Sequence, residues 1–209
     1  MPEEELEALA RLVYRAYAAL PEADGRQVDP ALLAGKLLRL KVVYRRLSRD
    51  GSILGITSPA PVGVPVLTSD GQDWFFLDGR TILLEERLRL PWASPGRRRF
   101  TLMHEIGHRL LGASGAGNEG QANRLASALL MPEVLLRRNL RAVSWRTGPL
   151  PDRRLDPERH RAFAALAETM GVSRQALGIR MEQLGLTGQS GWMLRPVPVL
   201  TPDGEEMEE

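Results

Sequence analysis

The stretch RFTLMHEIGH, residues 99–108, decides the fold of this chain. It places His104 and His108 four residues apart, with Glu105 directly after the first histidine. On an α-helix, residues four apart lie one turn above each other on the same face. Both imidazoles can therefore reach one metal ion at the ~2.0–2.1 Å of a zinc–nitrogen bond. Glu105 lies about 100° further around the helix, beside the ion and outside the ligand set.

The alternative explanation for this HExxH pattern is coincidence on a solvated helix. The chain has only three histidines, and two of them fall in the pattern. A chance match in a chain of this size is rare, on the order of one in a hundred. The pattern is typical of metalloproteases, in which the histidines bind zinc and the glutamate is the general base. Because the chain has no cysteine, only His, Asp or Glu residues can hold a metal.

A catalytic zinc ion commonly has three protein ligands and one open position. A third histidine soon after His108 would indicate the astacin-like class, but residues 109–114 contain none. Glu119, at the start of the next predicted helix, is the better candidate. Ala122 on that helix and Gly107 on the first allow the two helices to approach closely. The alternative role of Glu119 is a first-turn acid stabilised by the helix dipole.

Asn123 follows Glu119 by four residues, so both lie on one face of the second helix. Its side-chain carbonyl can accept a hydrogen bond from the free ring N–H of a ligand histidine, which fixes the tautomer and orientation of the ring. The alternative is an ordinary solvent-exposed asparagine.

The segment 42–86 has the pattern of a small, mainly antiparallel sheet. Asp-Gly pairs at residues 50–51, 70–71 and 78–79 separate short apolar runs, and such pairs favour hairpin turns because glycine accepts positive φ. The predicted strands are 42–44, 53–57, 64–67, 74–77 and 81–84. The last of these is predicted either as an edge strand that binds an extended substrate or as an ordinary core strand.

Apolar residues at helical spacing predict further helices on both sides of this sheet. The predicted helices are 3–20, 31–40, 100–111, 119–130, 157–170 and 174–184. Pro132 ends the fourth, and residues 144–157 form a linker rich in Pro, Gly and Arg. The fold class is therefore α+β.

The last two predicted helices, joined by Gly171-Val172-Ser173, have the shape of a helix-turn-helix. The residues available for reading DNA are Arg174, Gln175, Arg180 and Gln183. The second helix also carries Glu182 and the apolar residues Leu177 and Met181, so we expect it to pack on the rest of the protein and not to bind DNA directly. The predicted division is 1–143 as the metal-binding domain, 144–186 as linker and helix pair, and 187–209 as an extended or disordered tail.

Composition and charge limit the binding partners and cellular location that we expect for the protein. The formal net charge is only +2, which gives no basis for nucleic-acid binding. The acidic start Met1-Pro2-Glu3-Glu4-Glu5 is unlike a secretory signal, and no apolar run approaches the ~20 residues of a membrane span. We therefore expect a cytoplasmic protein that does not enter membranes.

Three segments together resemble the ImmA/IrrE family of metallopeptidases: residues 99–108, EGQAN at 119–123 and LLMP at 129–132. The resemblance is strongest over 97–132 and extends from about 30 to 186. It implies a zincin-like, more narrowly gluzincin-like, core with the HExxH helix and a second helix that bears a glutamate ligand. It also implies cleavage of helix-turn-helix repressors of the Xre type, in DNA-damage responses or mobile elements. Met103 and Leu125 depart from the residues common in the family, and both exchanges are apolar.

Two function classes follow from these residues. The first is a zinc-dependent endopeptidase in which Glu105 activates the attacking water, with manganese or another divalent ion as the alternative metal. A second oxyanion donor is left open among His160, Tyr44 and the arginines. The second class is a DNA-binding regulator with a zincin-like fold and no turnover. The intact Glu105 favours the enzyme, whereas salt-dependent DNA binding would favour the regulator.

Overall fold

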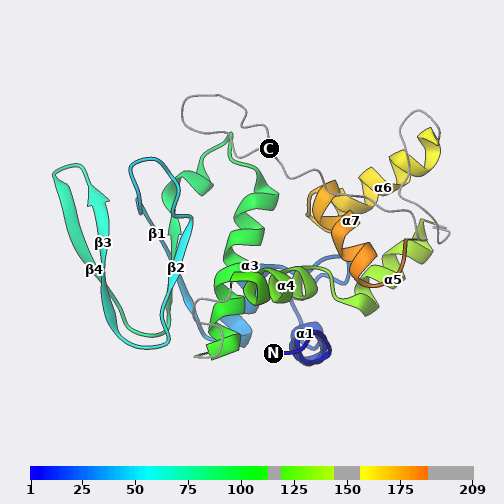
Figure 1. Cartoon of the computed structure of the whole chain (residues 1–209), viewed down its shortest axis with the longest axis horizontal. Coiled ribbons are helices and arrows are strands. Elements are labelled where there is room, and N and C mark those ends of the chain that lie inside the picture. The colour runs from blue at the N-terminus through cyan, green and yellow to red at the C-terminus, as the bar shows by residue number, and fades with distance from the viewer. Residues whose placement is uncertain (113–118, 144–155, 188–209) are drawn as a thin grey trace, which may run out of the picture.

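Helix α3 (Pro95–Leu111) lies at the centre of the fold, with the strands on one side and most of the other helices on the other (Figure 1). The computed structural model describes residues 1–112, 119–143 and 156–187. It confirms the predicted mixture of helices and small sheets. No helix in these ranges is long and apolar enough to span a membrane.

The three-stranded sheet beside α3 has the order β1–β5–β2. Strand β5 (Thr81–Glu85) is central, parallel to β1 (Lys41–Arg45) and antiparallel to β2 (Gly55–Thr57). All five β5 residues are buried, and the three apolar residues in the middle, Ile82 to Leu84, suit a strand covered on both faces. The prediction of 81–84 as an edge strand is therefore wrong, and its alternative as a core strand is confirmed. The edge nearest α3 is β2.

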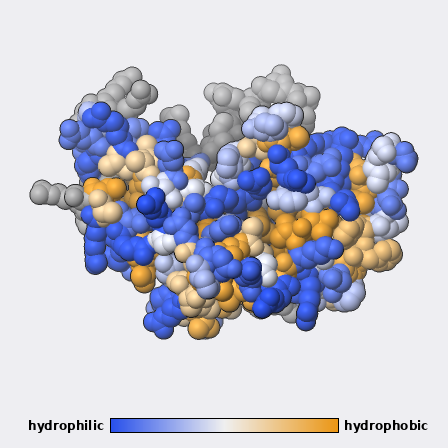
Figure 2. Space-filling view, turned by 180° about the vertical axis from the view of Figure 1, so that it is seen from behind, coloured by the Kyte–Doolittle hydropathy of each residue, from blue (hydrophilic) through white to orange (hydrophobic). Residues whose placement is uncertain are grey.

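A second sheet is the hairpin of β3 (Val62–Thr68) and β4 (Gly71–Leu77), which lies at the far end of the molecule in Figure 1. Trp74 and Phe76 share its outer face and are exposed, and Figure 2 shows apolar residues gathered on the strand-bearing half of the molecule. The antiparallel prediction thus holds for β2–β5 and β3–β4, but the strands form two sheets and β1–β5 is parallel. Of the three Asp-Gly pairs, only the one at 70–71 closes a hairpin between paired strands.

The helices agree with the prediction in most places. The remaining elements are α1 (Glu3–Ala18), α2 (Pro30–Leu32), η1 (Leu33–Leu37), η2 (Glu86–Arg89), α4 (Glu119–Leu130), α5 (Glu133–Ala142), α6 (Pro157–Thr169) and α7 (Arg174–Gln183). The helix predicted over 31–40 is instead one α-turn continued by π-turns. Helix α3 begins five residues before its predicted start, because Ser94 caps it and Pro95 opens it. Helix α5 was not predicted.

The helix pair α6–α7 packs into the same hydrophobic core as α1, α3 and α4, through residues such as Phe163 and Leu177. A buried arginine adds polar contacts. Arg180 donates to the Met131 carbonyl at 3.0 Å and pairs with the Glu7 carboxylate. Together these contacts fix α7 beside α4. The division at residue 143 stays a prediction, and most of the linker and tail lies outside the described residues.

Candidate metal centre

Helices α3 and α4 approach each other closely where the sequence carries small residues. A Cβ atom at Gly107 would lie only 3.1 Å from the main-chain oxygen of Ala122, so a larger residue would press against the main chain of α4. This close approach was predicted from the same two residues. It brings the start of α4 against the face of α3 that carries the histidines.

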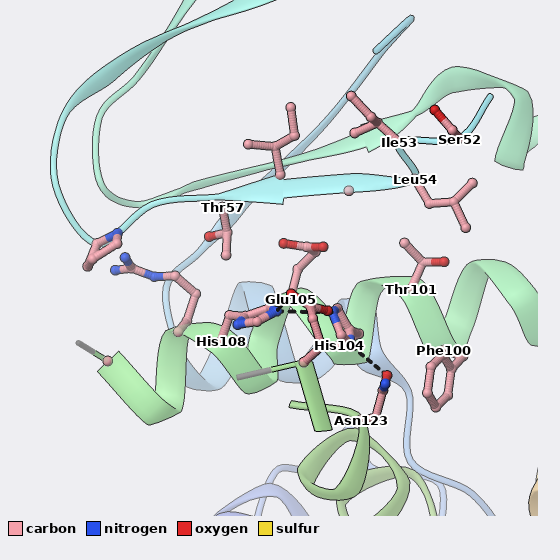
Figure 3. Close-up of a pocket in the computed structure, with 16 residues that line it drawn as sticks. Ser52, Ile53, Leu54, Thr57, Phe100, Thr101, His104, Glu105, His108 and Asn123 are labelled. Atoms are coloured by element: carbon pink, nitrogen blue, oxygen red, sulfur yellow. Dashed lines mark hydrogen bonds and ion pairs between the residues drawn. The ribbon is translucent and has the colours of Figure 1, made fainter. Parts of the chain in front are cut away.

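Three residues converge at this seam, as Figure 3 shows for the two histidines of α3. Nε2 of His104 lies 3.0 Å from Oε2 of Glu119, and Nε2 of His108 lies 3.3 Å from Oε1. The two Nε2 atoms are 3.0 Å apart. One potential ligand atom from each residue therefore lies within 4.8 Å of the others. The structure thus brings together the three residues that the sequence predicts as ligands.

Asn123 contacts the other ring nitrogen of His104. Its Oδ1 lies 2.9 Å from Nδ1, so in the tautomer that donates from Nδ1 the amide oxygen accepts this hydrogen bond. The Nε2 lone pair is then directed at Glu119 and His108, where an ion would bind. The contact predicted for Asn123 is present.

The donor set fits a divalent metal ion. Two imidazole nitrogens and one carboxylate are ligands that zinc and several other first-row ions accept. Burial, and then the neighbouring His108, lower the pKa of His104, which favours the neutral ring that a metal requires. Glu119 remains largely solvent-exposed, so the site is open to solvent on the α4 side.

Glu105 points away from the two histidines and toward strand β2 (Figure 3). It is 6% exposed, and its carboxyl group makes no hydrogen bond or ion pair with the other described residues. Burial, with a smaller contribution from Glu119, raises its pKa from 4.5 to about 8. A carboxyl group next to a potential metal site, with its pKa near neutrality, has the properties of a general base.

Gly55 provides the space that Glu105 occupies. A Cβ atom at this position of β2 would lie 2.4 Å from Oε1 of Glu105, so any larger residue would displace the carboxyl group. The sequence-based prediction missed Gly55. A glycine inside a strand is a signal of close approach by another group, and it was the only signal available.

A cleft of about 610 Å³ lies between β2 and α3 over these residues. Neither Tyr44 nor His160 lines it, so these two candidates for an oxyanion donor are not placed at the site. Tyr44 instead lies under the Arg89 guanidinium, and His160 lies 3.2 Å from Arg174. Among the described residues, Arg109 is the arginine that lines the cleft, and its Nη1 donates to the Ser58 carbonyl at 2.7 Å.

Comparison with protein families gives one match. Residues 69–182, more than half of the chain, match the profile of a peptidase family described as the IrrE N-terminal-like domain. The matched region runs from the hairpin turn before β4 to the end of α7, and includes α3 and α4 but not β2. A search of curated proteins finds no match to this chain.

Proposed function

We propose a function from one premise: this chain belongs to the IrrE N-terminal-like family of peptidases. The proposed function is zinc-dependent hydrolysis of an internal peptide bond, with His104, His108 and Glu119 as metal ligands and Glu105 as general base. The observation that carries it is the convergence of the three ligand atoms within 4.8 Å beside a buried carboxyl group.

The protein's own residues have distinct tasks in this reaction. Zinc, when bound, lowers the pKa of a water molecule to ~7 and polarises the scissile carbonyl. Glu105 accepts the proton of the attacking water and passes it to the leaving amine. Asn123 holds the His104 ring so that Nε2 faces the ion. Zinc is the proposed metal, and manganese or another divalent ion is the alternative for the same donor set.

Strand β2 is the proposed docking edge for the substrate. One side of β2 pairs with β5, and its residues line the cleft above α3. No strand in the described ranges pairs with its other side, where an extended peptide can add by main-chain hydrogen bonds, and antiparallel pairing is the more stable arrangement. In this direction, residues on the C-terminal side of the scissile bond leave the cleft near Ser52 and Phe100, to the right in Figure 3.

The proposed substrate is a helix-turn-helix repressor of the Xre type, which rests on the family resemblance. Cleavage would relieve repression during stress, DNA damage or the response of a mobile element, and such a substrate implies a protein that acts in the cytoplasm. Since β2 binds an extended peptide, the cut segment must be unfolded or loop-like when it binds.

The alternative function, a DNA-binding regulator without turnover, has weaker support. Among the residues of α7 that DNA reading would need, Arg180 is buried and paired with Glu7. A recognition helix whose arginine is held in the core has less charge for phosphates. The helix pair is therefore assigned to the support of the peptidase and not to DNA.

The test is cleavage of an Xre-type repressor, ideally one encoded beside this protein. Zinc-loaded protein is expected to cut it, chelation should stop the reaction, and added zinc should restore it. His160→Ala serves as the matched control for His108→Ala, because His160 lies outside the ligand cluster. Cleavage that survives both chelation and His108→Ala would contradict the proposed function.

A further inference from the structure

A second hollow opens beside the metal cleft, between α4 and α7. Its volume is about 340 Å³, and helices α3, α4 and α7 all contribute to its walls. Phe100 and Ile179 supply apolar surface, and Asn123, Gln175 and Gln183 supply amide groups. We call it the α4–α7 groove.

The α4–α7 groove adjoins the metal cleft. Phe100 and Asn123 line both. Figure 3 shows these two residues together at one end of the cleft, on the side where Ser52, Ile53 and Leu54 lie. A polypeptide paired antiparallel with β2 leaves the cleft at this end. Its residues on the C-terminal side of the scissile bond therefore leave the cleft next to the groove.

The chemistry of the groove fits a polypeptide. Ile179 is partly buried yet lies outside the hydrophobic core of the described residues, so a ligand in the groove can contact it. Gln175 and Gln183 are exposed, and each amide can donate to and accept from a main-chain peptide group. The nearby Arg124 is paired with Glu3 at 2.8 Å, which leaves less positive charge for an anionic ligand.

We propose that the α4–α7 groove is a second binding site for the substrate polypeptide, which accommodates an apolar residue on the C-terminal side of the scissile bond. This inference rests on the proposed function, because it takes the direction of the substrate from the docking on β2. It gives the helix pair α6–α7 a role: α7 is one wall of the substrate channel, and the contacts of Arg180 hold that wall in place.

Peptide selection on a zinc-loaded, catalytically inactive protein tests the proposal. The probe is a phage-displayed library of random dodecapeptides, selected on Glu105→Gln. The recovered peptides are then measured against the same protein carrying Ile179→Gln, with Leu12→Gln as the matched control, because Leu12 is 66% exposed on α1. Loss of one apolar contact at a binding site should weaken binding about tenfold in Ile179→Gln and leave the control unchanged.

Two further measurements separate the possible outcomes. Gln175→Ala, an exposed position in the same groove, repeats the test if Ile179→Gln lowers thermal stability. Removal of zinc should also weaken binding, since one peptide spans both sites. Three results would each overturn the inference. They are failure to recover peptides, an affinity in both groove variants that equals that of the unaltered groove, and binding that does not change when zinc is removed. Cleavage of the recovered peptides by the unaltered protein tests the endopeptidase separately, because peptides that bind through the groove and are never cut would contradict the proposed function alone.

Discussion

Glu85 and Glu105 are both buried acids, yet their surroundings differ in one decisive respect. Glu85, at the end of β5, is 1% exposed and accepts hydrogen bonds from the main-chain N–H of Leu47 at 2.9 Å and of Arg87 at 3.4 Å. Glu105 is almost as buried and has no such donor among the described residues. Its pKa is raised to about 8.

The difference between the two acids indicates that the reactivity of Glu105 comes from burial without hydrogen-bond donors. Burial of a carboxylate is costly unless donors or cations compensate it. Where the donors are present, at Glu85, the charge ties the end of β5 to the segment after β1. Where they are absent, at Glu105, the group holds its proton and is able to exchange it. The cation that would compensate Glu105 is the one proposed at the neighbouring ligand cluster.

Removal of a metal ligand is the most severe test of this comparison, because Glu105 has a task only beside a cation. We expect His108→Ala to lower zinc affinity well beyond the roughly 10–100-fold that loss of an outer hydrogen-bond partner costs. Competition with a chromogenic chelator measures the affinity. Unchanged zinc affinity in His108→Ala would mean that zinc does not bind at His108, and the burial of Glu105 would then be unexplained.

Stability against pH distinguishes the two acids in the metal-free protein. Because the folded pKa of Glu105 lies above its unfolded value, the native state holds the proton longer, and the free energy of unfolding falls as pH rises from 4.5 to about 8. Glu105→Gln removes this fall and should raise the free energy of unfolding at pH 8 by up to roughly 4 kcal/mol, with a smaller effect at pH 5. The lowered pKa of His104 also makes stability depend on pH, but this contribution is common to wild type and Glu105→Gln and cancels in the comparison.

Glu85→Gln should act in the opposite direction. It weakens hydrogen bonds that need a carboxylate, so we expect a loss of roughly 1–3 kcal/mol in the free energy of unfolding. Urea denaturation of all three metal-free proteins at both pH values provides the comparison. Destabilisation of both variants at pH 8 would mean that Glu105 is as well compensated as Glu85.

Gly55→Ala sharpens the comparison by moving Glu105 without changing it. The new Cβ would lie 2.4 Å from Oε1, so the carboxyl group must shift. A misplacement of about 1 Å in a catalytic group can lower kcat about a hundredfold, so we expect a loss of this order in Gly55→Ala, while zinc affinity should stay the same. Gly35→Ala is the matched control, because nothing lies within 4 Å of its Cβ position. Full activity in Gly55→Ala would show that the position of Glu105 is not critical.

Asn123→Ala has the smallest expected effect. Loss of its contact with His104 frees the ring to change tautomer, which should lower zinc affinity about tenfold. Arg124→Ala, its neighbour on α4, is the control and should bind zinc normally. Equal affinities would reduce Asn123 to a helix-surface residue.

The metal cluster was predictable because its geometry is mostly local. His104 and His108 are fixed by helical spacing, and Gly107 with Ala122 indicated that the two helices would meet closely. Gly55 was not predictable in the same way, since its contact with Glu105 joins residues far apart in the sequence, and a glycine inside a predicted strand does not say which group approaches it.

The sheet shows the limit of local turn signals. Asp78-Gly79 does turn the backbone, with φ of 75° at Gly79, but it leads from one sheet into another. Turn chemistry sets the local backbone, and burial decides which strands pair, which is why β5 became central. Helix α5 shows a further limit, because a proline such as Pro132 can end one helix and directly precede the next, so its presence alone does not predict a loop.

The most direct test of the central claim compares zinc-loaded wild type and Glu105→Gln, matched for zinc content, on one substrate that the wild type cuts. The account predicts that both proteins bind zinc and that kcat falls roughly 10²–10⁴-fold in Glu105→Gln, because the proton transfer is lost. A near-normal rate in Glu105→Gln would contradict it, since the buried carboxyl group would then not be the base.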